Sequence, residues 1–266
     1  MISSKPNARS PVTRVFAADP DHSNILLNTQ LLSLLPSARV ILVIAPVTLL
    51  YTALAGWLSG YLKMQRKVRT PYTRKVFHFL IFTMASVVQL VWQFPGVVVF
   101  GTIVSLIVLY AVVRGPGYPL YEALARPTDA PHRSLFVVIP LLTTIAGGLV
   151  SNILFPATAF VGYLVCGSGD AVGEPVGSRW GKHPYRVPSL SGVPATRTLE
   201  GSLAVFLVGS VAAALGLLAQ GTATGHALLV GLACGLGGAL VEAISNHGID
   251  NFTTQVAAAG IAQLLS

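Results

Sequence analysis

Charged residues are scarce in this chain. Only 10% of its 266 residues are Asp, Glu, Lys or Arg, against about 25% in a typical soluble domain. Hydrophobic residues make up 53% of the sequence, and the mean hydropathy is +0.70. This composition excludes a soluble globular protein and predicts an integral membrane protein.

Cysteine is also nearly absent. Cys166 and Cys234 both lie in apolar segments, so neither a disulfide framework nor a thiolate metal site is expected. The first 25 residues lack the apolar core of a signal peptide, and Asp19 and Asp21 make them a poor transit peptide. We expect residues 1–38 to form a polar tail that can include an interfacial helix at 24–35.

The remaining residues, 39–266, are expected to form a single all-α polytopic membrane domain with seven or eight transmembrane helices. A spanning helix needs about 20 apolar residues, and the fifth and eighth apolar runs are short by that measure. The runs lie at roughly 39–62, 76–94, 96–113, 134–151, 155–170, 200–219, 226–244 and 252–265.

The basic residues indicate orientation in the membrane. The connections 63–75, 114–133 and 170–199 hold 13 of the 17 Lys and Arg residues, and the intervening turns hold no charge. The positive-inside rule places these connections in the cytoplasm, which accounts for the net charge of +8 without a nucleic-acid partner. Alternation adds 245–251 to the same side, although the basic N-terminal tail would then start outside. We expect the plasma membrane of a prokaryote.

Acidic residues are rare, and most lie where a membrane protein has a functional reason to keep them. Five of the nine are at the predicted cytoplasmic ends of the later spans. Ionisable groups at membrane depth are costly unless paired or solvated, so they mark functional sites. These five are Asp170, Glu174, Glu200, Glu242 and Asp250.

The segment GSGDAVGEPVGSRWGKH, residues 167–183, has two regular patterns. On a helix Asp170 and Glu174 are one turn apart, and these like charges need a cation beside them. The glycines at every fourth position allow close helix packing, or they let a phosphate approach the backbone at a broken helix. Pro175 predicts that the helix kinks or ends there.

Three further segments, 69–80, 195–206 and 239–255, add polar groups to the same face. Each has a simpler interpretation. In 69–80, His78 would belong to a basic flank at the membrane interface. In 195–206, Thr198 would cap a helix and Glu200 would complement the helix dipole, and in 239–255 Asp250 would cap the last helix. Glu242, within an apolar run, needs a partner or a metal. Together the four segments predict phosphoryl or nucleotidyl transfer with Mg²⁺.

The chain has no Walker motif and no protein-kinase HRD or DFG set, which excludes those nucleotide-binding folds. The ordered motifs RKVFHF, GDAVGEPVGSRWGKH, RTLEGSLAVF and VEAISNHGIDN instead resemble the CTP-dependent polyprenol kinase family, which includes phytol and dolichol kinases. The resemblance covers roughly residues 70–255. Two departures are Arg197, where lysine is usual, and the absence of a proline that often follows Asp250 and Asn251.

The resemblance implies a cytoplasmic site that uses CTP and Mg²⁺ to phosphorylate a membrane-borne isoprenoid alcohol of the phytol, farnesol, geranylgeraniol or polyprenol type. It implies catalytic roles for Asp170, Glu200 and Asp250, and metal binding by Asp170, Glu174, Glu200, Glu242 and Asp250. Asp170 and Asp250 are both eligible to accept the hydroxyl proton. The implied nucleotide-binding residues are Arg74, Lys75, His78, Arg179, Lys182, Arg197, Thr198, Gly201 and Asn251.

Three other functions fit parts of the pattern. A phosphatidate cytidylyltransferase would use the same nucleotide, metal and lipid face but release pyrophosphate. An ion-coupled transporter also uses buried carboxylates and broken helices, although here the acidic groups lie at span ends. GSGD matches the GxGD signature of intramembrane aspartyl proteases, but no Asp lies between Asp129 and Asp170 to act as the second catalytic residue.

Overall fold

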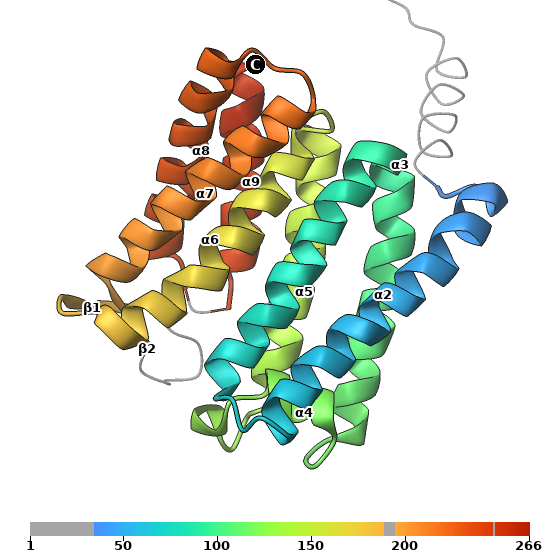
Figure 1. The fold of residues 1–266 in the computed structure, drawn as a ribbon, viewed down its shortest axis with the longest axis vertical. Coiled ribbons are helices and arrows are strands. Elements are labelled where there is room, and N and C mark those ends of the chain that lie inside the picture. The colour runs from blue at the N-terminus through green and yellow to red at the C-terminus, as the bar shows by residue number, and fades with distance from the viewer. Residues whose placement is uncertain (1–34, 189–194, 247) are drawn as a thin grey trace, which may run out of the picture.

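The computed structural model describes residues 35–188, 195–246 and 248–266, so the expected polar tail with its interfacial helix lies almost entirely outside them. The described chain is a bundle of long helices (Figure 1). The helices are α2 (Ala38–Met64), α3 (Thr70–Arg114), α4 (Pro119–Leu124), the 3-10 helix η2 (Pro127–Asp129), α5 (Leu135–Leu154), α6 (Ala159–Trp180), α7 (Leu199–Ala219), α8 (Thr224–Ile244) and α9 (Asp250–Leu265).

Five helices in the described part of the chain, α2, α3, α5, α7 and α8, are long and apolar enough to cross a membrane. This supports the predicted all-α membrane protein, but the expected count of seven or eight spans is not confirmed. The polar half of α6 contains Asp170 and Glu174, and α9 has only 16 residues. Neither therefore offers a full apolar span.

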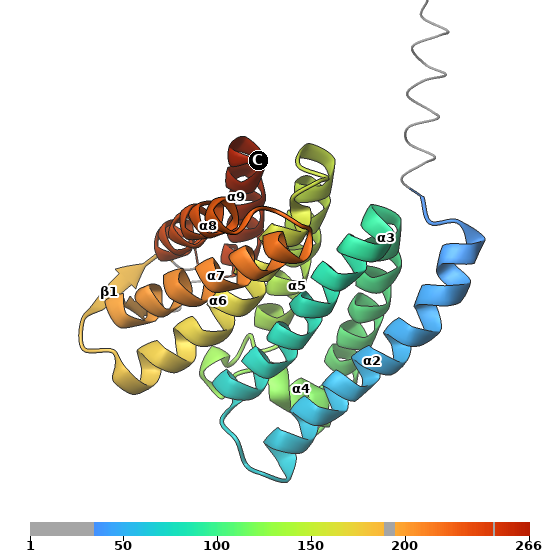
Figure 2. The ribbon, with the colours of Figure 1, turned by 45° about the horizontal axis from the view of Figure 1, so that its top comes forward.

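One helix, α3, takes the place of two predicted spans. Its 45 residues would form a rod roughly twice as long as the hydrocarbon core of a bilayer is thick. The backbone leaves the helical region at Gln93 (φ 54°, ψ −156°), two residues before Pro95, whose ring cannot be placed in an unbroken helix. Figures 1 and 2 show α3 turning back on itself, so that its first half (70–92) and second half (94–114) lie side by side.

The connections predicted to share one membrane face do gather at one end of the bundle. The start of α3, α4 and the β1–β2 hairpin all lie toward the lower end of Figure 1. The turn between α8 and α9 lies at the lower end of these two helices. The C-terminus and the turn in α3 lie at the opposite end. The grouping agrees with the alternation, and the cytoplasmic assignment of this face stays a prediction.

The sequence predicts cytoplasmic active-site loops at 63–75, 170–199 and 242–251, and these segments contain more regular structure than that. α6 neither ends at Pro175 nor gives way to a loop from residue 170, but continues to Trp180. An antiparallel hairpin of β1 (Pro184–Val187) and β2 (Ala195–Thr198) then leads directly into α7. Helix ends also lie inside the other two expected loops, 63–75 and 242–251: α3 begins within the first, and α8 ends and α9 begins within the second.

The glycines of α6 let it lie close to α7. A Cβ on Gly173 would lie 2.6 Å from Val205 Cγ2, and one on Gly177 would lie 2.7 Å from Thr198 Oγ1. From the other side, a Cβ on Gly201 would lie 2.8 Å from the carbonyl oxygen of Gly173. Real side chains do not tolerate such contacts, so the packing interpretation of the glycine stripe is confirmed.

The outward faces of the helices are apolar, as lipid contact requires. On α7, leucines 203, 207 and 215 are more than half exposed, and α8 has a matching row at 228, 232, 236 and 240. The interior packs in two clusters, one around Phe82 and Phe100 between α2 and α6, the other around Phe160 between α6 and α9. Most of the charged residues in the described part of the chain lie at one end of the bundle, where the candidate site forms.

Candidate active site

A polar pocket of about 280 Å³ lies at this end of the bundle, where the start of α3, the polar half of α6, the β2–α7 junction and the α8–α9 turn meet. Four segments distant in sequence thus contribute to one site, as the four motifs predicted. The pocket is lined by Arg74, Lys75, Arg126, Asp170, Gly173, Glu174, Gly177, Ser178, Thr196, Arg197, Thr198, Gly201, Ser202, Glu242, Asp250 and Asn251.

Three carboxylates converge inside this polar pocket. Asp170, Glu242 and Asp250 each place one oxygen so that the three oxygens lie within 4.8 Å of one another. Asp170 comes from α6, Glu242 from the last turn of α8, and Asp250 from the first residue of α9. Oxygen donors of this kind and spacing suit Mg²⁺, which is bound by carboxylates together with substrate phosphates.

Lys75 is the cation that the two like charges of α6 required. Its Nζ lies 2.6 Å from Asp170 Oδ1 and 3.5 Å from Glu174 Oε2. Lys75 is itself buried, in the first turns of α3. The ion pair therefore fixes the start of α3 against α6 and keeps both carboxylates charged inside the protein.

Arg197 gives the buried Glu242 its partner. Arg197 Nε lies 3.3 Å from Glu242 Oε1, and Arg197 Nη2 donates a hydrogen bond to Asp250 Oδ2 at 2.8 Å. Strand β2 presents Arg197 opposite Tyr185 of β1, immediately before α7 begins. The hairpin thereby carries a guanidinium to two carboxylates on other helices, and the planar fork can hold both at once.

Arg126 belongs to the site although no motif indicated it. It lies between α4 and η2, and its Nη2 donates to Glu174 Oε2 at 3.1 Å. The one available signal was its position in a basic connection on the predicted active-site face. Arg133 holds this turn, because it donates to the carbonyl oxygens of Ala125 (2.7 Å) and Arg126 (3.2 Å).

Glu122 in turn holds Arg133 in place, because Arg133 Nη2 donates a hydrogen bond to Glu122 Oε2 at 2.8 Å. Glu122 also accepts a hydrogen bond from the Gly117 N–H. Partial burial works to raise the pKa of Glu122, but the bonds from Arg133 and Gly117 outweigh it and lower the pKa below its ordinary value. The ion pair therefore persists to a lower pH than a Glu with an ordinary pKa would allow, and it is lost as the pH falls through the lowered pKa.

Three arginine nitrogen atoms at the polar pocket are buried without a hydrogen-bond partner among the described residues. They are Arg74 Nη1, Arg126 Nε and Arg197 Nη1. Buried donors are normally paired, and an arginine fork matches the oxygens of a phosphate. Three arginines that line one pocket and each keep an unpaired nitrogen therefore favour an anionic ligand with several phosphate oxygens.

Some predicted site residues do not line the polar pocket. Glu200 is 2.7 Å from His183 Nδ1 at the pocket's outer side, Arg179 lies over the ring of Trp180, and Lys182 is exposed just beyond α6. Thr198 does line the pocket, and it also caps α7 by accepting a bond from the Gly201 N–H at 3.1 Å. The simpler interpretation of Thr198 is thus confirmed alongside its place in the site.

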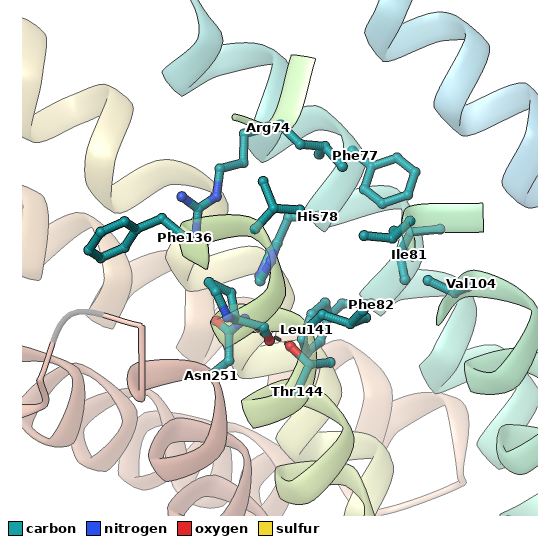
Figure 3. A pocket seen from close by; sticks show the side chains of 14 residues that line it. Arg74, Phe77, His78, Ile81, Phe82, Val104, Phe136, Leu141, Thr144 and Asn251 are labelled. Carbon is teal, nitrogen blue, oxygen red and sulfur yellow. Dashed lines mark hydrogen bonds between the residues drawn. The ribbon is translucent and has the colours of Figure 1, made fainter. Parts of the chain in front are cut away.

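His78 faces a different compartment. It lines a small apolar cavity of about 90 Å³, here called the neck, which shares Arg74 and Asn251 with the polar pocket (Figure 3). His78 Nε2 lies 3.4 Å from Asp170 Oδ2. Asn251 is oriented by donating to Thr144 Oγ1 at 2.8 Å, as the dashed line in Figure 3 shows. His78 and Asn251 thus stand between the carboxylates and an apolar space.

A larger apolar chamber of about 350 Å³ continues from the neck. It lies between the two halves of α3 and α5, and Tyr163 of α6 adds to its wall. The neck and the chamber have five lining residues in common, which are Ile81, Phe82, Val104, Leu141 and Thr144. The polar pocket, the neck and the apolar chamber therefore lie next to one another in series, each sharing part of its wall with the next.

Comparison with known proteins points in the same direction as the motifs. The chain is 29% identical over 192 residues to the phytol kinase of Synechocystis sp., and the aligned region covers 71% of this chain and 77% of that protein. No protein-family model and no solved structure matches the chain. The similarity thus supports a kinase relationship at the level of distantly related sequences.

Proposed function

We propose that this protein is a membrane lipid kinase that transfers the γ-phosphoryl group of CTP to the hydroxyl of an isoprenoid alcohol. The observation that carries the proposal is a charged pocket next to an apolar cavity, with Arg74 and Asn251 lining both and His78 of the cavity 3.4 Å from Asp170 of the pocket. A phosphate donor fits the first compartment and a hydrocarbon acceptor fits the second. CTP is proposed from the resemblance of the four motifs, and an alcohol like phytol from the named relative.

The charge of the polar pocket favours a nucleotide that binds together with a divalent cation. Its lining has four basic side chains, Arg74, Lys75, Arg126 and Arg197, and four carboxylates, Asp170, Glu174, Glu242 and Asp250. These charges cancel, so a bare triphosphate would bring an uncompensated negative charge into the pocket. Asp170, Glu242 and Asp250 would hold Mg²⁺, which when bound neutralises phosphate charge and orients the oxygens for transfer.

The chain's own residues account for the remaining steps. Arg74, Arg126 and Arg197 bind phosphate oxygens through their unpaired nitrogens. The acceptor hydroxyl reaches the junction from the neck, and its oxygen attacks the γ-phosphorus in line as the bond to the β-phosphate oxygen breaks. The products are the alkyl monophosphate and CDP. Asp170 accepts the hydroxyl proton, because among the candidate bases it is the one beside His78 in the neck.

The decisive experiment follows the γ-phosphate. Purified protein is incubated with γ-labelled CTP, Mg²⁺ and either a prenyl alcohol or phosphatidate, and the labelled products are separated. A kinase puts the label into the lipid and leaves CDP. Label appearing in pyrophosphate with phosphatidate, and none in any alcohol, would show a cytidylyltransferase instead.

Removal of divalent cations is expected to abolish transfer. Without Mg²⁺ the triphosphate charge is not balanced in a pocket whose own charges cancel, so EDTA should stop the appearance of labelled alkyl phosphate and added Mg²⁺ should restore it. The control is EDTA already saturated with Mg²⁺. Full activity in EDTA with no free divalent ion would contradict the proposed role of the three carboxylates.

Glu122→Gln is expected to weaken nucleotide binding without stopping the reaction. The substitution loosens Arg133, which holds the turn that carries Arg126, and a partly exposed ion pair is worth up to about 1 kcal/mol, or roughly fivefold. We expect KM for the nucleotide to rise by that factor or less, with kcat nearly unchanged. A large fall in kcat at constant KM would show that Glu122 acts on the chemical step instead.

A further inference from the structure

The apolar chamber has the properties of a hydrocarbon-binding site. Its polar groups are already satisfied within the protein: Ser105 Oγ donates to Gly101 O at 2.6 Å, Thr102 Oγ1 to Val98 O at 2.7 Å, and Tyr163 accepts from Asn152 at 2.8 Å. The arginines of the polar pocket are in the opposite condition, with nitrogens left unpaired. A molecule bound in the chamber would therefore make apolar contacts, whereas a molecule bound in the polar pocket would meet charged groups.

The chamber also borders the membrane. It lies between helices that are apolar and long enough to span a bilayer, α3 and α5, and part of its wall is exposed: Leu106 is 62% exposed, Leu149 42% and Ile145 38%. Side chains that line a cavity and also face outward mark an opening. A lipid tail could thus pass sideways from the bilayer into the chamber without contacting water.

Gly101 is the residue of the chamber wall whose missing side chain matters most. A Cβ built on Gly101 meets no atom within 4 Å, whereas one on Gly148 of the same wall would lie 2.9 Å from the Tyr163 hydroxyl oxygen. Gly148 is needed for packing, and Gly101 is not. Glycine is also a poor helix former, so neither packing nor helix stability accounts for it. What the structure does show is that Gly101 lines the chamber and has open space where a side chain would begin.

The position of Gly101 on α3 shows how far its place in the chamber wall is from the neck. It lies three residues from Val104, which belongs to both the neck and the chamber, and four from Val97, which belongs to the chamber alone. At the rise of a helix these separations are about 4.5 Å and about 6 Å. A side chain at 101 would thus obstruct the chamber just beyond the neck and leave the neck itself open.

We propose that the apolar chamber holds the hydrocarbon tail of the acceptor alcohol, which enters from the bilayer between the second half of α3 and α5, and that the absence of a side chain at Gly101 admits the longer tails. This rests on the proposed function, since that function places the hydroxyl of the same molecule at His78 and Asn251. The chamber then determines which prenyl alcohols are used.

The test is Gly101→Leu, with Gly225→Leu as its matched control. A Cβ on Gly225 also meets no atom within 4 Å, and Gly225 lies at the start of α8, away from the chamber. Both variants and the parent protein are assayed with prenyl alcohols of one to four isoprene units. We expect Gly101→Leu to lower kcat/KM for the four-unit alcohol by roughly tenfold or more and to leave the one-unit alcohol within about twofold. Gly225→Leu should follow the parent protein.

A second measurement separates failure of this inference from failure of the proposed function. A prenyl alcohol with a diazirine at the end of its tail is photolysed with the full-length protein, and the labelled peptides are identified. Label in 81–85, 94–106 or 141–149, or at Tyr163, competed by unlabelled alcohol and reduced in Gly101→Leu, supports the chamber even if the parent protein phosphorylates nothing. Label elsewhere, or an equal loss of kcat/KM at every chain length, overturns the chamber while a working kinase remains.

Discussion

Replacing Asp170 with Asn is expected to reduce phosphoryl transfer by about 10³-fold, because this side chain is proposed both to accept the hydroxyl proton and to bind Mg²⁺. An amide cannot accept the proton as a carboxylate does, and it brings no charge to the metal. Asn has nearly the same shape, so Lys75 keeps Glu174 as a partner. The loss should therefore appear mainly in kcat.

The measurement is the initial rate of labelled alkyl phosphate formation at saturating CTP and alcohol. Asp129→Asn is the matched control, because Asp129 is a buried carboxylate at the same end of the bundle that does not line the polar pocket. Thermal unfolding in detergent shows whether each variant is folded. If folded Asp170→Asn retained more than a tenth of the parent rate, Asp170 could not be the proton acceptor, and Asp250 would take its place in the mechanism.

The sequence was informative about which residues gather at one end of the molecule. Spacing alone put Asp170 and Glu174 on one stripe of a helix. The positive-inside rule put the segments around 74 and 197 on the same face, and alternation of the spans added the segment after 242. The need for a cation near the like charges was also predicted. What spacing does not provide is the partner, because Lys75 is 95 residues from Asp170 in the chain and meets it through the packing of α3 on α6.

Other features depend on tertiary geometry that no local pattern contains. Arg126 enters the pocket through a turn held by Arg133, and nothing in the short segment around it distinguishes it from a basic flank. Glu200 lies in a motif next to pocket residues, yet its side chain points to His183. The apolar chamber arises because α3 folds back at Gln93, which places two apolar segments opposite α5. In the sequence those segments look like ordinary lipid-facing spans.

Arg197→Met is expected to damage both folding and activity. The substitution leaves Glu242 and Asp250 without their shared guanidinium, and these carboxylates are only 10% and 16% exposed. Breaking a buried ion pair on one side costs about 3–5 kcal/mol, and the lower value is expected here because the polar pocket admits water. Activity should fall further, because Arg197 also offers an unpaired nitrogen to a phosphate oxygen. Thermal unfolding and nucleotide KM measure the two effects.

Two companion variants separate these effects. Arg197→Lys keeps the charge, and lysine is usual at this position in the family that the motifs resemble, so it should fold normally and lose only part of the activity because an ammonium cannot hold both carboxylates in a planar fork. Arg197→Met combined with Glu242→Gln removes one of the two orphaned charges. It should regain much of the lost stability, but its activity should stay low, because it lacks both the hydrogen-bond donor for phosphate and one of the three proposed Mg²⁺ ligands. Recovery of activity in this double variant would contradict both the phosphate-binding role of Arg197 and the metal-binding role of Glu242, and would leave phosphate binding to Arg74 and Arg126, which line the same pocket.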